Sequence, residues 1–409
     1  MQISTSSPIV LKTGRAVPQA AKVEIPLIDL SFQHQPLQSK IEQAIQGIIQ
    51  RGDYILGWAV TEFEFAFAHA CGCHHGVGVG SGTDAIALGL RACGLQPGDE
   101  VLVPANVPVP TLLGVLAAGV TPILVDCILE TGLIDIVAAE KAISPRTRAI
   151  LPVHLYGQMV SPRQLLDLAS TFDLVIFEDA TQAHLAEREG YRAGSVGMAA
   201  AFCFSPWKNL GGVGDGGLVV TRHHEIATQV RSLCNFGATR KHYHPYVGTN
   251  SRLDSLQAAV LTVKLSLLSR WNSDRNSLAQ YYDELFSQQG TGIQPLRNDA
   301  GSGHVYERYI LRVTPSSSVS RSVLQAILTA NGIQTDIPMA MPCYSQPAFR
   351  GLGYSFGSFP NTDALSQQSL LLPLYPGLSL ANVRRVAETV LAAGGDRQYY
   401  DIFYPCHWA

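Results

Sequence analysis

The stretch AFCFSPWKNLGGVGDGG, residues 201–217, sets one cationic side chain between an apolar run and a series of glycines. That side chain is Lys208, and the next charged residue along the chain is Asp215. Burial favours the neutral amine of a lysine. The stretch therefore leaves two alternatives: Lys208 is a charge in an exposed flexible loop, or it is an amine kept ready to react.

Apolar runs alternate with helical stretches around Lys208, six before it and one after it. The runs are GVGVG (76–80), EVLVPA (100–105), TPILVDC (121–127), RAILPVHLYG (148–157), DLVIFEDA (173–180), AAAFCFS (199–205) and GGLVVT (216–221). Helical periodicity lies between them, as in TDAIALGLRACG and SPRQLLDLASTF. This alternation predicts a three-layer α/β domain with a mostly parallel sheet of seven strands, covered by helices on both faces.

The pattern changes past residue 250, where long helices lead to a strand at VYERYILRVT, a helix at SRSVLQAILTANG and a final helix at ANVRRVAETVLAAG. A smaller C-terminal α+β domain is expected there. We expect a flexible N-terminal arm over residues 1–24, the large domain over 25–260 and the small domain over 261–409.

The composition excludes several classes of protein. Among 409 residues, 46% are hydrophobic and 15% are charged, and the net charge is -3. No basic excess indicates a nucleic-acid partner, and no apolar run is long enough to cross a membrane. Since the N-terminus lacks the apolar core of a signal peptide, the cytoplasm is the expected compartment. So few charges also favour a surface that is covered by another subunit.

The eight cysteines are scattered along the chain and are expected to be reduced thiols. The stretch HACGCHH, residues 69–75, holds five side chains that are able to bind a metal. Its spacing matches no usual zinc site, and no second pair completes it elsewhere. We therefore expect the end of an amphipathic helix there and no metal.

Two groups of polar residues follow expected strands, where open α/β sheets bind ligands. SGTDA (81–85) opens a helix, and it either caps that helix or binds a phosphate through free N–H groups. EDATQAH (178–184) follows a buried strand. There Asp179 is placed to hold a cationic ring nitrogen, with Gln182 near a ring hydroxyl, unless Glu178 and Asp179 only cap the next turn.

Lys208 follows Asp179 by 29 positions and lies just past another strand. A partly desolvated lysine is able to form a Schiff base with an aldehyde. The glycines after it fit neither of the usual nucleotide-binding patterns. Further on, Asn250 and Arg252 in VGTNSRLD (247–254) are either helix caps or residues that face a phosphate across a subunit boundary.

Taken together, these groups resemble the DegT/DnrJ/EryC1/StrS family, the pyridoxal-phosphate sugar aminotransferases of fold type I. The resemblance runs from about residue 25 to about residue 379. It rests on six stretches: GVGSGTDAIALGL, QPGDEVLVPA, ILPVHLYGQ, FEDATQAH, PWKNLGGVGDGGLVVT and NSRLDSLQAAVL.

The resemblance implies a role for each cofactor residue. Lys208 matches the Schiff-base lysine, and Asp179 matches the acid that keeps the pyridine nitrogen of pyridoxal 5'-phosphate protonated. Gln182 matches the partner of the phenolic oxygen. Gly82 and Thr83 match the phosphate turn. Asn250 matches a residue that reaches the phosphate of the neighbouring subunit, which implies a homodimer with shared active sites.

The resemblance also implies the reaction, which is a ping-pong transfer of an amino group from glutamate or glutamine to a keto sugar. The acceptor is expected to be a nucleotide-linked keto-deoxysugar or a cyclitol ketone. Substrate candidates are His184, Tyr344 and the basic residues Arg240, Lys241 and His242, which either meet a diphosphate or carry solvated charge in an exposed loop. Two other readings stay open: an elimination or carbon–carbon bond-forming reaction on an amino acid, and a non-catalytic regulatory role.

Three departures from the family pattern stand out. Cys203 occupies the place of a phosphate-binding serine, five positions before Lys208. Pro108 occupies the place of an aromatic ring that stacks on the cofactor. Pro338 and Tyr344 replace two histidines on the substrate side. Because a thiol is a weaker donor than a hydroxyl and proline has no π-system, we expect an altered cofactor site and substrate pocket.

Overall fold

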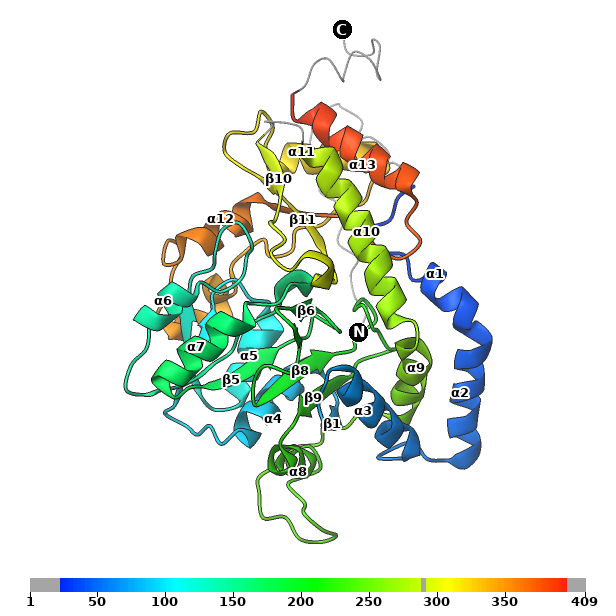
Figure 1. The fold of residues 1–409 in the computed structure, drawn as a ribbon, viewed down its shortest axis with the longest axis vertical. Helices are drawn as coiled ribbons and strands as arrows, with labels where there is room; N and C mark the ends of the chain where they lie inside the picture. Colours follow the sequence, from blue (N-terminus) through cyan, green and yellow to red (C-terminus); the bar gives the residue numbers. More distant parts are fainter. Residues whose placement is uncertain (1–22, 288–291, 396–409) are drawn as a thin grey trace, which may run out of the picture.

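The computed structural model describes residues 23–287 and 292–395. Its centre is a seven-stranded sheet in the order β1-β9-β8-β5-β4-β2-β3 (Figure 1). The strands are β1 (His75–Val79), β2 (Glu100–Pro104), β3 (Thr121–Val125), β4 (Thr147–Ile150), β5 (Val175–Asp179), β8 (Ala199–Cys203) and β9 (Gly217–Thr221). Each strand overlaps one of the seven apolar runs, so the predicted sheet is confirmed.

The direction of β9 is the one exception in this sheet. β9 runs antiparallel to both of its neighbours, β1 and β8. The other neighbouring strands are parallel. Because β1, β5 and β8 point the same way, the segments that follow their carboxyl ends meet at one edge of the sheet. The chain then returns into β9 through the glycine-rich loop that holds Lys208.

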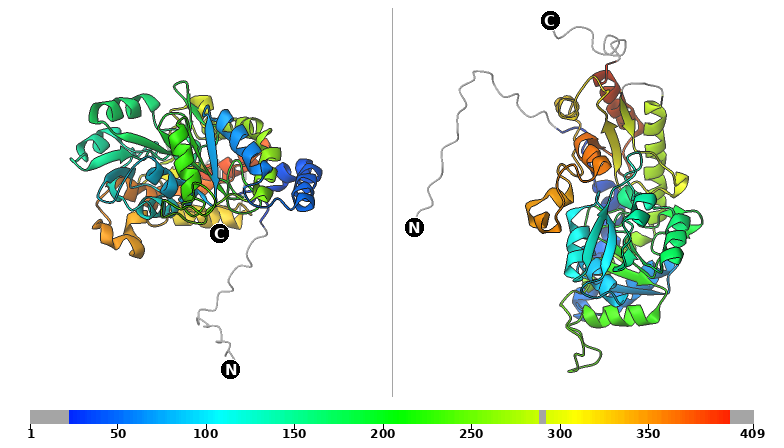
Figure 2. Two further views of the ribbon diagram at one scale, coloured as in Figure 1. Left: turned by 90° about the horizontal axis from the view of Figure 1, so that it is seen from below. Right: turned by 90° about the vertical axis from the view of Figure 1, so that its left-hand side faces the viewer.

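Helices cover both faces of the large sheet (Figure 2). Val219 of β9 belongs to the same core as Ile86, whereas its neighbours Leu218 and Val220 belong to a second core with Phe63. Alternate side chains therefore point to opposite faces. One face carries α4 (Gly82–Ala92), α5 (Val109–Ala117) and α8 (His224–Leu233), and the other carries α3 (Trp58–Ala70) and α7 (Pro162–Phe172), beside α6 (Ile136–Lys141).

The C-terminal part lies above the large sheet in Figure 1 and is built around a small antiparallel sheet. Its strands are β10 (Ile293–Pro295), β11 (Tyr309–Val313) and β12 (Ser369–Leu372). Its helices are α10 (Leu268–Phe286), α11 (Arg321–Ala330), α12 (Pro360–Gln368) and α13 (Leu380–Ala393), and α9 (Ser255–Leu265) leads into α10. The expected α+β architecture is confirmed.

The N-terminal segment joins the two parts of the molecule. Ile25 pairs with Ile333 and lies in the core of the C-terminal part, after which α1 (Ser31–His34) and α2 (Gln38–Arg51) run along the large domain. Of the expected arm, residues 1–22 lie outside the described residues, and so does Cys406. The domain boundaries at residues 24 and 260 stay predictions.

Short elements complete the fold. A hairpin of β6 (Glu187–Arg188) and β7 (Tyr191–Arg192) was not expected, because two-residue strands leave no apolar pattern. Five short 3-10 helices are η1 (Gln35–Leu37), η2 (Leu155–Gly157), η3 (Gly301–Gly303), η4 (Cys343–Ser345) and η5 (Pro347–Leu352). Within residues 23–287 and 292–395, no helix is both long and apolar enough to cross a membrane.

Candidate active site

The carboxyl edge of the large sheet brings three of the predicted groups together. Asp179 ends β5 and lies opposite Ala201 of β8, whose strand leads to Lys208. The start of α4 packs directly on the end of β8. A Cβ atom added to Gly82 would lie 2.6 Å from the Cβ atom of Cys203. Only glycine allows this approach, so the expected phosphate turn lies beside the segment that carries Lys208.

Asp179 is a fully buried carboxylate without a cationic partner. Its Oδ2 accepts a 2.7 Å hydrogen bond from the Thr111 hydroxyl, and its Oδ1 accepts from the backbone N–H and hydroxyl of Thr181. No lysine, arginine or histidine of the described chain forms an ion pair with it. Since burying an unpaired charge is costly, this carboxylate suits a bound molecule with a protonated nitrogen.

Glu178 has a different environment from its neighbour. Its carboxylate accepts hydrogen bonds from the backbone N–H groups of Gly194, Val196 and Gly197 and from His154 Nε2, all between 2.8 and 2.9 Å. His154 Nδ1 accepts from a backbone N–H, so Nε2 carries the proton. Glu178 therefore holds the 194–197 segment in place, whereas the cap of the next turn, which the sequence left open for this pair, comes from Asp179 alone.

The first turn of α4 has the features of both alternatives for SGTDA, the helix cap and the phosphate site. The Ser81 hydroxyl caps the helix by accepting from the backbone N–H of Asp84 at 3.1 Å. The backbone N–H groups of Gly82 and Thr83 make no hydrogen bond within the described chain. Free N–H groups at the positive end of an eleven-residue helix suit a phosphate.

Lys208 is mostly buried, with 16% of its side chain exposed, so it is not a solvated loop charge. Its Nζ donates to Glu307 Oε1 at 3.3 Å. The backbone around it is fixed, because Lys208 N donates to Ser205 O and the side chain of Asn209 binds Asn272 and the carbonyl of Val305. The loop therefore presents a positioned amine.

Gln182 lies in the turn after β5 and is buried. Its Oε1 accepts from the backbone N–H of Tyr156 at 2.9 Å. Tyr156 has a left-handed backbone, with φ at 58°, and this bond stabilises the strained turn. The Nε2 group of Gln182 makes no hydrogen bond to the described residues, which leaves a donor for a ligand oxygen.

The structure places two of the departures close to these groups. Cys203 contacts Gly82, and its Sγ donates to Ser205 Oγ at 3.7 Å. Pro108 precedes α5, the helix whose Thr111 binds Asp179. Their roles toward a cofactor stay predictions.

His184 lies in a box of aromatic rings formed by Phe67, Phe202 and Phe204. Its Nε2 is 2.9 Å from the carbonyl oxygen of Cys203. Burial, together with the Lys208 cation, lowers the pKa of this imidazole to about 3, so the ring is neutral. The imidazole has no exposed surface, and its substrate role stays a prediction.

Tyr344 is also fully buried. Its hydroxyl binds Asp363, and its ring packs edge-on against Phe359. Burial, together with Asp363, raises the pKa of the phenol. The structure therefore shows a packed core tyrosine, and the proposed substrate contact is untested.

The basic residues of the 235–250 loop lie in a projection beyond α8 (Figure 1). Arg240, Lys241 and His242 are exposed, and Arg240 stacks on Tyr243. They contact neither Lys208 nor Asp179 within the described chain. Asn250, at the base of the loop, is exposed too, while the next residue, Ser251, binds Asp84 in the first turn of α4 at 2.7 Å.

The helix α3 ends within the stretch 69–75, as expected: His69 lies in its last turn, and His75 begins β1. Cys71 and Cys73 are buried, and Cys73 Sγ donates to the carbonyl of Gly194 at 3.0 Å. Among residues 23–287 and 292–395, no three such side chains form a group able to hold a metal ion.

Sequence reasoning missed Thr111 and Glu307. Thr111 lies 68 residues from Asp179, and Glu307 lies 99 residues from Lys208. Neither belongs to a recognisable pattern. The only trace of Thr111 is a threonine in the first turn of an apolar helix. The only trace of Glu307 is a lone acid in the stretch VYERYILRVT, just before β11.

Comparison with known proteins gives consistent matches over most of the chain. A model described as the DegT/DnrJ/EryC1/StrS aminotransferase family matches residues 35–391. Over 373 residues, the chain is 39% identical to the dTDP-3-amino-3,4,6-trideoxy-alpha-D-glucose transaminase of Streptomyces venezuelae, which covers 91% of this chain and 97% of that protein.

Two solved structures share the fold. DesV of S. venezuelae, in complex with a ketimine intermediate, superposes with a TM-score of 0.86 at 39% identity and covers 90% of this chain and 98% of its own. NtdA of Bacillus subtilis, with bound cofactor PMP, superposes with a TM-score of 0.83 at 28% identity and covers 93% and 86%.

Proposed function

The chain belongs to the DegT/DnrJ/EryC1/StrS aminotransferase family, and on that premise we propose that it moves an amino group from glutamate or glutamine to the ketone of a nucleotide-linked sugar. It is an aminotransferase that depends on pyridoxal phosphate. The observation that carries the proposal is the buried Asp179 carboxylate, which has no cationic partner among the described residues and lies at the same sheet edge as Lys208.

The residues of this edge fit the cofactor. Asp179 would keep the ring nitrogen protonated, Gln182 Nε2 would donate to the ring oxygen, and the N–H groups of Gly82 and Thr83 would hold the phosphate. Pyridoxal phosphate supplies an aldehyde and an electron-withdrawing ring. Lys208 would anchor the cofactor and carry the proton between donor, cofactor and acceptor.

A homodimer forms part of the proposal. Large apolar side chains are exposed in two segments, namely Tyr54, Ile55, Leu56, Trp58, Phe236, Tyr243, Tyr246 and Val247. A cavity of about 520 Å³ lies between these segments and is lined by Leu56, Val60, Asn235 and Ala238, among others. Exposed apolar surface around a cavity of this size supports binding of a protein partner. Asn250 follows the second of these segments in the sequence.

The compartment is a further part of the proposal. All seven cysteines of the described chain are free. Free thiols suit a reducing compartment such as the cytoplasm.

The direct test is a half-reaction. The holoenzyme, incubated with glutamate or glutamine and no acceptor, should release one equivalent of the keto acid while the bound cofactor changes its absorbance to that of the amine form. Keto-sugar nucleotides are then screened for reversal of this change. Lys208→Ala is the control, since it should bind the cofactor without the spectrum of a lysine adduct.

Release of a product other than the keto acid would favour an elimination or carbon–carbon bond-forming reaction. A bound cofactor that turns over no amino donor would favour a regulatory role.

A further inference from the structure

Glu307 is a buried carboxylate directly beside Lys208. It lies in the segment that leads into β11, and 3% of its side chain is exposed. Its Oε1 is 3.3 Å from Lys208 Nζ and 3.6 Å from Arg308 Nη2. Burying a charged group costs stability. This contact is therefore a candidate for a functional role as well as a structural one.

The backbone on both sides of Glu307 is tied to the residues of the cofactor site. Glu307 N donates to Tyr156 O at 2.8 Å, and Tyr156 N in turn donates to Gln182. On the other side, Asn209 binds the carbonyl of Val305. Gly157, with φ at 99°, permits the close approach, since a Cβ there would lie 2.9 Å from Glu307 N.

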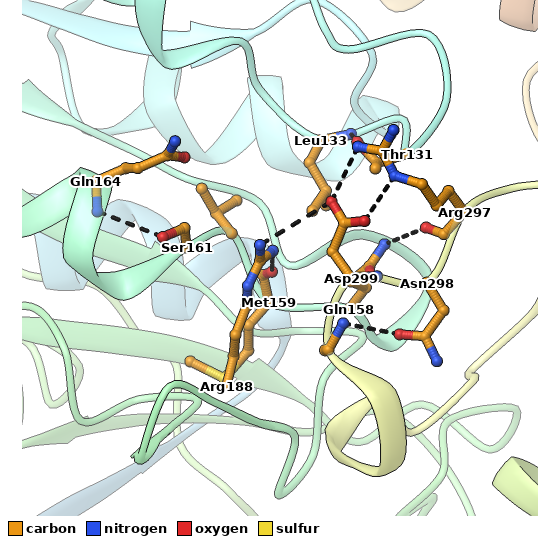
Figure 3. Close-up of polar contacts among 12 residues, drawn as sticks. Thr131, Leu133, Gln158, Met159, Ser161, Gln164, Arg188, Arg297, Asn298 and Asp299 are labelled. Atoms are coloured by element: carbon orange, nitrogen blue, oxygen red, sulfur yellow. Dashed lines mark hydrogen bonds and ion pairs between the residues drawn. The ribbon is translucent and has the colours of Figure 1, made fainter.

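The segment that precedes Glu307 is docked on the large domain as well (Figure 3). Gln158 Oε1 accepts from the backbone N–H of Asp299, and its Nε2 donates to the carbonyl of Arg297. Arg188 donates to the carbonyl of Met159 at 2.8 Å, next to this contact. The carboxylate therefore has a fixed position relative to Lys208, as preorganised catalytic groups require.

The charges around this pair favour the ionised acid. Burial raises the pKa of Glu307, but the Lys208 and Arg308 cations outweigh it and hold this pKa below its ordinary value. Arg275 of α10 adds a third cation nearby. Two further titratable groups of the described chain interact with this pair: His184, which is neutral, and the phenol of Tyr156, whose pKa burial raises. Glu307 is therefore the carboxylate that faces Lys208 from the C-terminal part.

We propose that Glu307 is a positioning residue for Lys208. Whenever Lys208 is not joined to the cofactor, the carboxylate of Glu307 binds the lysine side chain as an ammonium group. The role in turnover rests on the proposed function. In that role, the ion pair keeps Lys208 protonated between the steps of turnover, and it returns the Lys208 amine to the same position beside Glu307. No bond other than hydrogen bonds changes in this contact.

The test measures Lys208 itself in cofactor-stripped, full-length protein. Acylation of Lys208 by a small anhydride is followed by mass spectrometry as a function of pH, since only the neutral amine reacts. Glu307→Gln should move the pH midpoint of acylation down by about 1 to 3 units, because an opposite charge within 4 Å favours the protonated form. Glu307→Asp keeps the charge and should restore most of the midpoint.

Two controls make the outcome decisive. Glu187→Gln removes an exposed carboxylate that pairs with Arg192, and it should leave the midpoint unchanged. Thermal melting reports any loss of folding. An unchanged midpoint in both folded Glu307 variants would overturn the proposal. Since acylation needs neither donor nor acceptor, failure of the proposed function would show separately, as a wild-type holoenzyme that forms no keto acid.

Discussion

At Cys203, a sulfur atom in place of a hydroxyl oxygen is expected to weaken cofactor binding. The thiol lies against Gly82, beside the free N–H groups expected to hold phosphate, where the family resemblance implies a hydroxyl. Because a hydroxyl is the better donor, Cys203→Ser should tighten cofactor binding by about 0.5–1.5 kcal/mol, or roughly 2- to 10-fold. Equilibrium dialysis of the cofactor measures this. Cys93→Ser, at the far end of α4, is the control, and an equal gain there would contradict the assignment.

The adjacent acids Glu178 and Asp179 should respond in opposite ways. Glu178→Gln replaces an acceptor of four hydrogen bonds by an amide whose NH₂ accepts none, so the free energy of unfolding should fall by about 2 kcal/mol or more. Asp179→Asn removes an unpaired buried charge and should cost little stability. It should slow the half-reaction on the order of 100-fold, since a preorganised charge is lost. Denaturant unfolding and single-turnover rates, measured on both variants, separate the two roles, and equal losses would contradict them.

Single residues could be predicted from the sequence where the backbone pattern placed them. Lys208 and Asp179 follow apolar strands, so the sheet edge they share is readable in advance. Glu307 and Thr111 were not predictable, because their roles depend on tertiary contacts across 99 and 68 residues. The burial of His184 and Tyr344 was not predictable either, because the residue type alone does not show whether a histidine or tyrosine lies in the core or lines a binding pocket.

At the scale of elements, α9 is joined to the glycine-rich loop by Lys264. This residue is 3% exposed, and its Nζ lies 2.7 Å from the carbonyl of Gly211 and 2.8 Å from His34 Nε2. Burial lowers the pKa of Lys264 from 10.5 to about 8. The helix α9 and the last residue of α1 therefore meet at a lysine that has no carboxylate partner among the described residues.

This lysine predicts a dependence of stability on pH. Between about pH 8 and 10.5 the unfolded chain binds a proton at Lys264 that the folded chain has lost. Lys264 should therefore contribute a rise of about 3 kcal/mol to the free energy of unfolding across this window. Burial raises the pKa values of several cysteines, such as Cys93 and Cys127, and these thiols contribute a fall over the same window. In denaturant titrations, the free energy of unfolding of the wild type minus that of Lys264→Met should rise by this amount between about pH 8 and 10.5, whereas Lys40→Met, at an exposed site on α2, should follow the wild type. Parallel curves for wild type and Lys264→Met would contradict the prediction.

Elements were predictable to the extent that burial leaves a pattern. Parallel strands covered on both faces read as apolar runs, and all seven were found on that basis. The antiparallel direction of β9 was not readable, because a buried strand has the same composition in either direction. The β6–β7 hairpin is too short to have a period, and the three-stranded sheet was represented by a single expected strand, at β11.

At the scale of the whole molecule, a site shared by two chains and a site formed within one chain give different predictions. The exposed apolar residues at 54–58 and 236–247 favour a dimer, and Asn250 follows the second segment. Ser251, however, binds the first turn of α4 in its own chain. The sequence supports action across the boundary only through the family resemblance, so the two arrangements need a direct test.

Mixed dimers provide that test. Lys208→Ala and Asn250→Ala should each inactivate both sites of their own homodimer. If Asn250 acts on the partner, a mixed dimer has one site with both residues intact. Random reassociation of equal amounts should then recover about a quarter of wild-type activity, since half of the dimers are mixed and each has one of two sites. If Asn250 acts within its own chain, no mixed dimer has an intact site and activity stays at the residual level. Light scattering before and after mixing confirms the dimer mass, and a monomeric wild type would contradict the shared site outright.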